Sequence, residues 1–239
     1  MLLRWNADLS ARLREAEVMD QPGLDRTSHL RALKGLARLN WISRSAAIVW
    51  KPLAALMPDG RRPLRVLDLA TGSGDVLVRV WQCARRRGRS VDLWGVDASP
   101  LAIETARERA ARTRAAVRFE QLDVLKEDLP SGFDAIICSL FLHHLESGEA
   151  IGLLARMAGA TRRLVLANDL VRSRIGLRTV TLATRLVTRS EVVHVDAVRS
   201  VRAAFTVGEA RELARAAGMQ DARVTPRWPC RMLLTWERR

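Results

Sequence analysis

A glycine-rich turn follows the first mostly apolar run of the chain. The run covers residues 64–70, contains Asp68 near its end, and leads through Thr71, Gly72 and Gly74 into a helical pattern. Glycine lets the backbone approach a ligand closely, and the N–H groups at the start of the following helix point toward that ligand. The turn therefore indicates a site for a nucleotide-like cofactor.

Asp68 and Leu77 discriminate between the cofactors that such turns serve. A dinucleotide fingerprint that starts at Gly72 requires glycine or alanine at position 77, where Leu77 stands. The carboxylate of Asp68 would repel a pyrophosphate, but it suits a cofactor that carries an ammonium and a sulfonium. These two residues favour S-adenosylmethionine over a nicotinamide dinucleotide.

Two further aspartates stand at the ends of later strand-like runs. Asp97 lies 25 residues after Gly72, and its carboxylate can accept both hydroxyls of a ribose. The alternative role, capping the next helix, falls to Ser99 instead. Asp123 follows the third run and can accept from an adenine amino group, although it can also be an ordinary loop aspartate. The order of these residues at successive strand ends makes the set specific.

His143 and His144 follow the fourth strand-like run, at the edge where ligands bind in parallel sheets. A histidine titrates near neutral pH and can take the proton of a phenol, so one of them is a candidate general base, with His143 favoured. In the alternative interpretation, the pair only lines the cofactor pocket. Asn168 and Asp169 end the fifth run and can orient an acceptor or take its proton.

Alternation of strands and helices predicts the fold. We expect strands at residues 64–70, 91–96, 117–122, 133–139 and 163–167, and helices at residues 75–87, 100–112 and 206–217. A hairpin of residues 222–225 and 231–236 closes the sheet edge. The prediction is an α/β, doubly wound (Rossmann-like), mostly parallel seven-stranded sheet with a C-terminal antiparallel hairpin.

The remaining segments are predicted to be helical. Residues 1–60 show no strand pattern, and residues 27–40 have the spacing of an amphipathic helix. We expect an N-terminal helical cap at 1–62 and an α/β domain at 63–239 that carries a helical insertion at about 171–204. This insertion is either a cover over an apolar pocket or a helix packed on the sheet edge. On residues 174–189 the four arginines form one stripe, and apolar side chains occupy most of the remaining circumference.

Composition narrows the choice of partners. The net charge is +14, and almost all of the positive charge is arginine spread over every predicted element, which does not predict nucleic-acid binding. Contact with a membrane surface stays an open alternative, as does the oligomeric state. Cys83, Cys138 and Cys230 are too far apart for a zinc motif, and no apolar stretch approaches the about 20 residues that span a bilayer. A cytoplasmic location is expected.

Residues 66–75 resemble motif I of class I S-adenosylmethionine-dependent methyltransferases. Alanine at position 70 is similar to the ubiquinone and menaquinone biosynthesis methyltransferases, and residues 95–99, 122–124 and 133–139 match the later motifs in order. A narrower resemblance, to small bacterial methyltransferases associated with type III polyketide synthases, rests on residues 39–40, 138–145, 168–170 and 227–229 together. The resemblance implies that the methionine part binds Asp68, Ala70, Thr71, Gly72 and Gly74, the ribose Asp97 and Ala98, and the adenine Asp123 and Val124, with Ser139 and Leu140 bordering the site.

The resemblance implies methyl transfer from S-adenosylmethionine to a small apolar phenolic, quinol or polyketide-like acceptor, on oxygen or carbon. His143, His144 and Asp169 are the candidate catalytic residues, and no metal is expected. An RNA methyltransferase is the alternative, but Ser139-Leu140-Phe141-Leu142 stands where an Asn-Pro-Pro-aromatic motif would follow the fourth strand. A non-catalytic partner protein with a vestigial cofactor site is a further alternative.

Overall fold

The computed structural model describes residues 9–20, 23–57 and 62–238. One seven-stranded sheet has the order β3-β2-β1-β4-β5-β7-β6, in which β7 pairs antiparallel with both β5 and β6 and the other pairs are parallel. The strands are β1 (Leu64–Leu69), β2 (Val91–Asp97), β3 (Val117–Gln121), β4 (Phe133–Ser139), β5 (Thr161–Leu170), β6 (Arg223–Arg227) and β7 (Arg231–Glu237). The predicted Rossmann-like fold with its antiparallel hairpin is confirmed.

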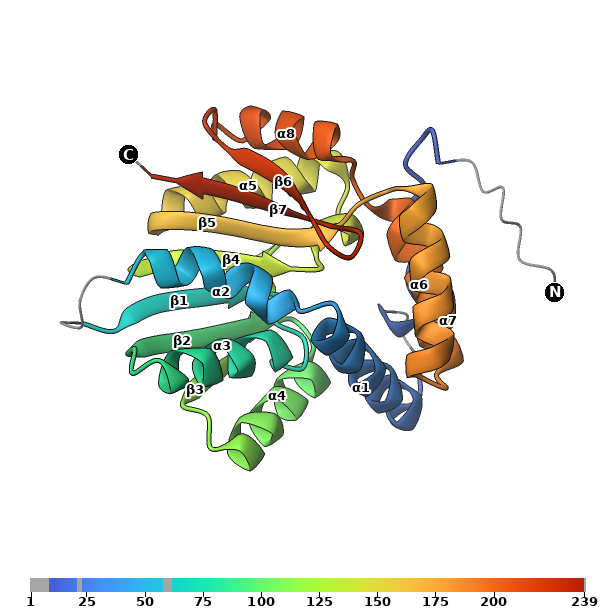
Figure 1. Cartoon of the computed structure of the whole chain (residues 1–239), viewed down its shortest axis with the longest axis horizontal. Coiled ribbons are helices and arrows are strands. Elements are labelled where there is room, and N and C mark those ends of the chain that lie inside the picture. The colour runs from blue at the N-terminus through green and yellow to red at the C-terminus, as the bar shows by residue number, and fades with distance from the viewer. Residues whose placement is uncertain (1–8, 21–22, 58–61, 239) are drawn as a thin grey trace.

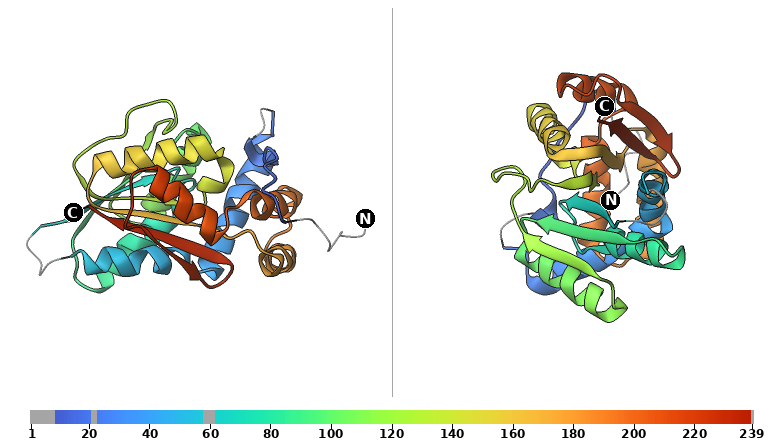
Figure 2. Two further views of the ribbon diagram at one scale, coloured as in Figure 1. Left: turned by 90° about the horizontal axis from the view of Figure 1, so that it is seen from above. Right: turned by 90° about the vertical axis from the view of Figure 1, so that its left-hand side faces the viewer.

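Helices cover both faces of this sheet (Figures 1 and 2). On one face lie α2 (Ser45–Ala55), α3 (Asp75–Arg86) and α4 (Pro100–Thr113), and on the other lie α5 (Ser147–Ala160) and α8 (Val207–Ala216). All residues of β4 but the last are buried, as expected for a central strand that is covered on both sides. The apolar core therefore forms two layers, one on each side of the sheet.

Local capping residues start the helices where the sequence predicts. The Ser99 hydroxyl accepts the Ala102 N–H, and Pro100 occupies the first turn of α4, where its missing N–H costs nothing. Thr206 and Glu209 form a reciprocal capping box at the start of α8. These caps fix the residues at which α4 and α8 begin.

Three more helices stand beyond the C-terminal ends of the parallel strands (Figure 1). They are α1 (Arg26–Ile42), α6 (Arg174–Val187) and α7 (Glu191–Ala203), and each contacts the other two. Two short 3₁₀ turns, η1 (Val18–Asp20) and η2 (Leu142–His144), lie beside α7. In the described residues, no helix combines the length and apolar character that crossing a membrane would require.

The N-terminal region differs from the continuous helix pattern expected for residues 1–60. Residues 9–20 are irregular apart from η1, and α2 packs against α3 and β5 within the sheet core. We refer to residues 9–20 as the strap. Its backbone is held by other elements, because the N–H groups of Val18 and Met19 donate to the Asp196 carboxylate, and such long-range bonds leave no periodicity in the sequence.

Close packing makes Gly95 necessary, whereas Gly152 in α5 is unconstrained. A Cβ on Gly95 would lie 2.8 Å from the Phe119 ring, but one on Gly152 would meet nothing within 4 Å. Gly95→Ala should lower the free energy of unfolding by about 1–3 kcal/mol because the core is overpacked. Gly152→Ala should raise it by about 0.5–1 kcal/mol because alanine loses less backbone entropy in a helix. Urea denaturation of both variants tests this, and equal effects would contradict it.

Candidate active site

The turn after β1 is held by its own polar groups. The Thr71 hydroxyl donates to Asp68 Oδ2 at 2.7 Å, and the Gly74 N–H donates to the Thr71 carbonyl at 3.0 Å. Ala70, Gly72 and Gly74 all have positive φ, between 51° and 67°. Alanine is strained in this region, by about 1–2 kcal/mol, so the hydrogen bonds around it must compensate that strain.

The Asp97 carboxylate joins this turn to the turn after β2. Its Oδ2 accepts the Gly72 N–H at 2.8 Å, and its Oδ1 accepts the Ser99 N–H at 2.9 Å. Both oxygens keep lone pairs for further donors, because a carboxylate accepts about four hydrogen bonds. Asp97 therefore has a fixed orientation and can still accept ribose hydroxyls.

Two more strand ends complete this rim. Asp123 follows β3, where Oδ1 accepts the Leu125 N–H at 3.1 Å and Oδ2 pairs with the Lys126 ammonium at 2.9 Å. Leu140 follows β4 with φ 58°, and its N–H donates to the Asn168 carbonyl at 2.8 Å. The left-handed backbone at both Ala70 and Leu140 turns the chain at the carboxyl edge of the sheet.

A single cavity of about 750 Å³ runs along this rim. It is lined by ten of the eleven predicted cofactor residues, namely Asp68, Ala70, Thr71, Gly72, Asp97, Ala98, Asp123, Val124, Ser139 and Leu140. Gly74 stands away from the lining, and a Cβ there would lie 2.6 Å from the Phe119 ring. Glycine at position 74 thus serves helix packing as well as the turn.

The same cavity extends under α1, α6 and α7. Its walls there are largely apolar and include Leu33, Leu36, Thr179, Val180, Ala183, Ala197 and Val201. We call this part the acceptor compartment and the part beside Asp68 and Asp97 the cofactor compartment. The helices that build the acceptor compartment come from segments about 150 residues apart in the chain, so only the fold brings them together.

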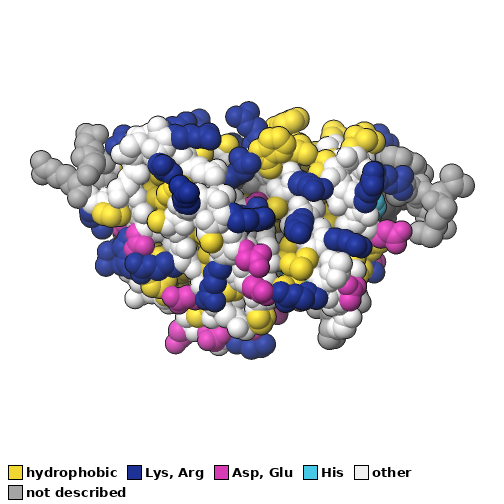
Figure 3. All heavy atoms as spheres, turned by 90° about the horizontal axis from the view of Figure 1, so that it is seen from below, with side chains coloured by type: hydrophobic (Ala, Val, Ile, Leu, Met, Phe, Trp, Pro, Cys, Tyr) yellow, Lys and Arg dark blue, Asp and Glu magenta, His cyan; other side chains and the backbone are white. Residues whose placement is uncertain are grey.

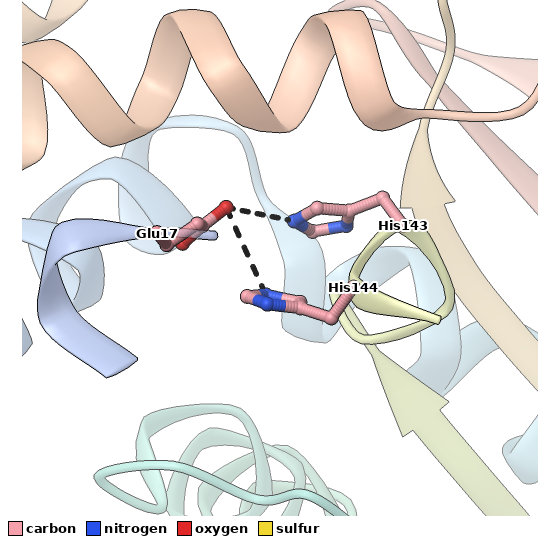
Figure 4. A group of neighbouring side chains, drawn as sticks. All are labelled: Glu17, His143 and His144. Carbon is pink, nitrogen blue, oxygen red and sulfur yellow. Dashed lines mark ion pairs between the residues drawn. The ribbon is translucent and has the colours of Figure 1, made fainter. Parts of the chain in front are cut away.

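His143, His144 and Glu17 meet on the cavity wall (Figure 4). Asp169 Oδ1 lies 2.7 Å from His143 Nδ1, and Asp169 Oδ2 accepts the His143 backbone N–H at 3.1 Å. On the opposite side, Glu17 Oε1 lies 3.6 Å from His143 Nε2 and 3.9 Å from His144 Nε2. The structure therefore brings together all three predicted catalytic residues, although Asp169 acts behind His143 and does not line the cavity.

The two carboxylates set the charge state of His143. Burial opposes protonation, but Asp169 and Glu17 outweigh it and raise the pKa of His143 to about 10. The pKa of Asp169 is lowered, because the nearby imidazolium and backbone donors offset the desolvation of its carboxylate. At neutral pH His143 therefore carries a proton, which it would have to lose before it could act as the candidate general base.

The strap positions the histidine loop. Arg12 donates to the carbonyl groups of His143 and Leu145, at 2.9 and 2.6 Å. Arg14 donates to the His144 carbonyl at 3.1 Å and pairs with the Glu146 carboxylate at 2.6 Å. Bonds from a guanidinium to buried carbonyls are strong because the donor is charged. The strap thereby fixes the loop that carries both histidines and places Glu17 beside them.

Glu17 is the functional residue that sequence reasoning misses. It lies in a mixed Arg and Glu segment without motif or periodicity, and it is buried only because the strap folds over the loop. His29 also lines the cavity. His194 lies within hydrogen-bonding distance of the Thr188 carbonyl, at 2.9 Å. No pattern around Glu17 signals its role, since its partners are more than 120 residues away.

The cofactor compartment fits S-adenosylmethionine. Asp68 Oδ1 is buried without a hydrogen-bond partner among the described residues, so its carboxylate is available to a cationic group. A Cβ on Gly72 would meet nothing within 4 Å, which leaves the backbone open to a ligand. A carboxylate at the first strand end and another at the second match an ammonium-bearing, phosphate-free nucleoside. These features agree with the predicted roles of Asp68 toward the methionine part and of Asp97 toward the ribose.

Comparison with known proteins defines the class of protein to which the domain belongs. Residues 66–163 match the family model described as a methyltransferase domain. The fold, the glycine turn and this match identify the segment as a class I S-adenosylmethionine-dependent methyltransferase domain. The resemblance noted in the sequence is confirmed.

The particular relatives are quinone methyltransferases. The chain is 31% identical over 119 residues to a demethylmenaquinone methyltransferase from Deinococcus radiodurans, and the match covers 49% of this chain and 48% of that protein. It is 31% identical over 127 residues to a demethylmenaquinone methyltransferase from Thermus thermophilus, with 52% and 56% covered. The chain thus spans about half the length of these curated relatives.

Solved structures share the fold. Human N-acetylserotonin methyltransferase in complex with S-adenosylmethionine has a TM-score of 0.63 at 15% identity, covering 89% of this chain and 57% of that one. At this identity the likeness concerns the fold alone. The family match, rather than this likeness of fold, confirms the expectation of S-adenosylmethionine as the cofactor.

Asp68 should make cofactor binding depend on pH. Burial raises the pKa of Asp68 to about 7, the Thr71 hydroxyl opposes this shift, and the charges of Asp75 and Asp97 add to it. Below that pH the group is neutral and loses its attraction for an ammonium. The affinity for S-adenosylmethionine should therefore fall about tenfold between pH 8 and pH 6.

Calorimetric titration of the wild-type protein and of Asp68→Asn at both pH values measures this dependence. The variant should bind more weakly, with an affinity that changes little with pH. An equal affinity of the wild-type protein at pH 6 and pH 8 would show that the ammonium group of the cofactor does not bind Asp68.

Proposed function

We propose that the protein transfers a methyl group from S-adenosylmethionine to a small apolar phenolic or quinol acceptor. The observation that carries this proposal is the single cavity in which the cofactor compartment opens directly into the apolar acceptor compartment. Methyl transfer needs the acceptor atom next to the cofactor and water excluded from both. The volume of about 750 Å³ lies within the range of small-molecule sites.

The helical cap and the insertion support an apolar acceptor. We propose that α1 of the cap predicted at 1–62 and α6 and α7 of the insertion at 171–204 form the acceptor compartment. Their cavity-facing side chains are mainly leucine, valine, alanine and threonine, which suit an aromatic ring with a lipid-like substituent. The relatives are named as demethylmenaquinone methyltransferases, which agrees with such an acceptor.

The histidine loop handles the proton of the acceptor. The cofactor supplies an electrophilic methyl group on a sulfonium. In the proposed arrangement the acceptor oxygen lies beside His143 and His144, Asp169 holds the His143 ring in place, and an imidazole or the Glu17 carboxylate receives the proton. The strap and α7 exclude water from this position, because they cover the loop.

Incubation with S-adenosylmethionine and reduced naphthoquinols or alkyl-phenols should form methylated product, detected by mass spectrometry, together with S-adenosylhomocysteine. Asp97→Ala should weaken cofactor binding about ten- to hundredfold, since it removes hydrogen bonds to a charged group. Asp92→Ala is the matched control, because Asp92 starts the same strand and pairs with Arg65 away from the cavity.

Two results would overturn the proposed activity. One is methylation of RNA in preference to the phenolic and quinol acceptors, and the other is cofactor binding without turnover of any of them. Arginine and lysine side chains are scattered among hydrophobic and acidic ones on the face shown in Figure 3, rather than gathered in one dense track. A phosphate backbone would prefer such a track.

We also propose that the outer face of α6 rests on an anionic lipid surface. Ile175, Leu182 and Leu186 are 73%, 61% and 78% exposed, and they share this face with Arg178 and Arg185. Arginine and apolar side chains are thus mixed on one exposed face, and not separated as the sequence pattern indicates. Apolar side chains among cations suit the boundary of an anionic membrane. The opposite face of α6 lines the acceptor compartment, so a lipid-like acceptor would have a short path into the site.

Sedimentation with phosphatidylglycerol vesicles tests this surface. The wild-type protein should bind, and Leu182→Glu with Leu186→Glu should reduce binding at least about tenfold, because burying each leucine contributes about 1.5–3 kcal/mol. Ala155→Glu, on an exposed position of α5, adds the same kind of charge elsewhere and should have little effect. Equal binding of the double variant and the control would exclude α6 as the contact.

A further inference from the structure

We propose that Glu17, His143 and His144 bind a divalent metal ion of the zinc class on the wall of the acceptor compartment. Each residue offers one ligand atom, and the three atoms all lie within 4.8 Å of one another. Figure 4 shows the two imidazole rings and the carboxylate turned toward a common point. The sequence predicts no metal here, because Glu17 joins the histidines only in the folded chain.

The spacing of the ligand atoms fits such an ion. Bonds of about 2.0–2.2 Å in tetrahedral geometry place ligand atoms about 3.3 Å apart. Glu17 Oε1 is 3.6 Å from His143 Nε2 and 3.9 Å from His144 Nε2, and the two imidazole nitrogens lie within 4.8 Å of each other, so side-chain movements must bring the three ligand atoms closer together around one ion. Two imidazole nitrogens and one carboxylate oxygen, without a thiolate, are typical ligands of Zn²⁺ and Co²⁺.

Neighbouring residues already orient two of the three ligands. Asp169 occupies His143 Nδ1 at 2.7 Å, which leaves Nε2 to face Glu17 and the cavity. The Ser200 hydroxyl donates to Glu17 Oε1, and this oxygen keeps a second lone pair for a metal. Metal-binding histidines usually have a carboxylate or carbonyl on their second nitrogen, and such partners fix the ring.

The charges around the three ligands and their access to the cavity both favour a bound metal ion. Glu17 and Asp169 place two buried carboxylates around one imidazole, and a dication would balance both after it replaces the proton on His143 Nε2. All three ligands line the cavity, so the remaining coordination positions face the acceptor compartment. This inference rests on the proposed function for its role: with the ion bound, an acceptor hydroxyl would release its proton to water and be held as a phenolate, instead of passing that proton to Glu17 or an imidazole.

Metal binding is measured on the full chain after dialysis against a chelator. Co²⁺ titration should produce visible d–d absorption that saturates at one ion per chain, and Zn²⁺ should displace it with the same stoichiometry by atomic emission. Glu17→Gln and His144→Asn should each weaken Co²⁺ binding by more than the roughly 10- to 100-fold typical of outer-shell partners. Two variants are used so that a folding defect in one leaves the other interpretable.

Glu15→Gln is the matched control. Glu15 lies on the same strap but pairs with Arg199 and Arg202 at the surface, so this variant should bind Co²⁺ like the wild-type protein. Absence of a stoichiometric ion in the wild-type protein, or equal binding in Glu17→Gln and His144→Asn, would overturn the site. S-adenosylmethionine binding and methyl transfer, measured on the same samples, report on the proposed function separately, since neither enters the Co²⁺ readout.

Discussion

The carboxylate of Asp97 accepts backbone N–H groups from two turns, those of Gly72 and Ser99, and the cofactor compartment is built around this connection. β1 and β2 are parallel neighbours, so their turns emerge side by side at one edge. The turn after β1 contains an alanine in the left-handed region, which is stable only if the surrounding bonds determine it. Asp97 supplies that restraint while it presents oxygens to the cavity.

Parallel strands bring chemistry to a single edge, because all their C-terminal ends face the same way. Asp68, Asp97, Asp123, Ser139 and Asp169 each stand at or just beyond such an end, although they are spread over about 100 residues of sequence. The sheet thus separates two tasks. Strand ends hold the cofactor, and the acceptor compartment is left to α1, α6 and α7, which can vary in sequence without disturbing the sheet core.

The strap links these two tasks. Arg12 and Arg14 bind the carbonyl groups of the histidine loop, and Glu17 then lies against both imidazoles. Burial of this carboxylate is tolerated because His143 and the Ser200 hydroxyl satisfy it, and its pKa is lowered despite its desolvation. The reactive end of the cavity therefore depends on contacts between the beginning of the chain, the loop after β4 and α7.

The sequence by itself determined the sheet, the glycine turn and the aspartates of the cofactor compartment, because these features depend on local periodicity and short-range turn chemistry. Thr71, Gly72 and Asp97 are recognisable from their spacing alone. Only the tertiary structure decided that Glu17 joins the histidines, that Asp169 holds His143, and that α6 exposes leucines among its arginines. These contacts join residues that are far apart in the chain or depend on which helix face is covered, and neither property leaves a periodic signal.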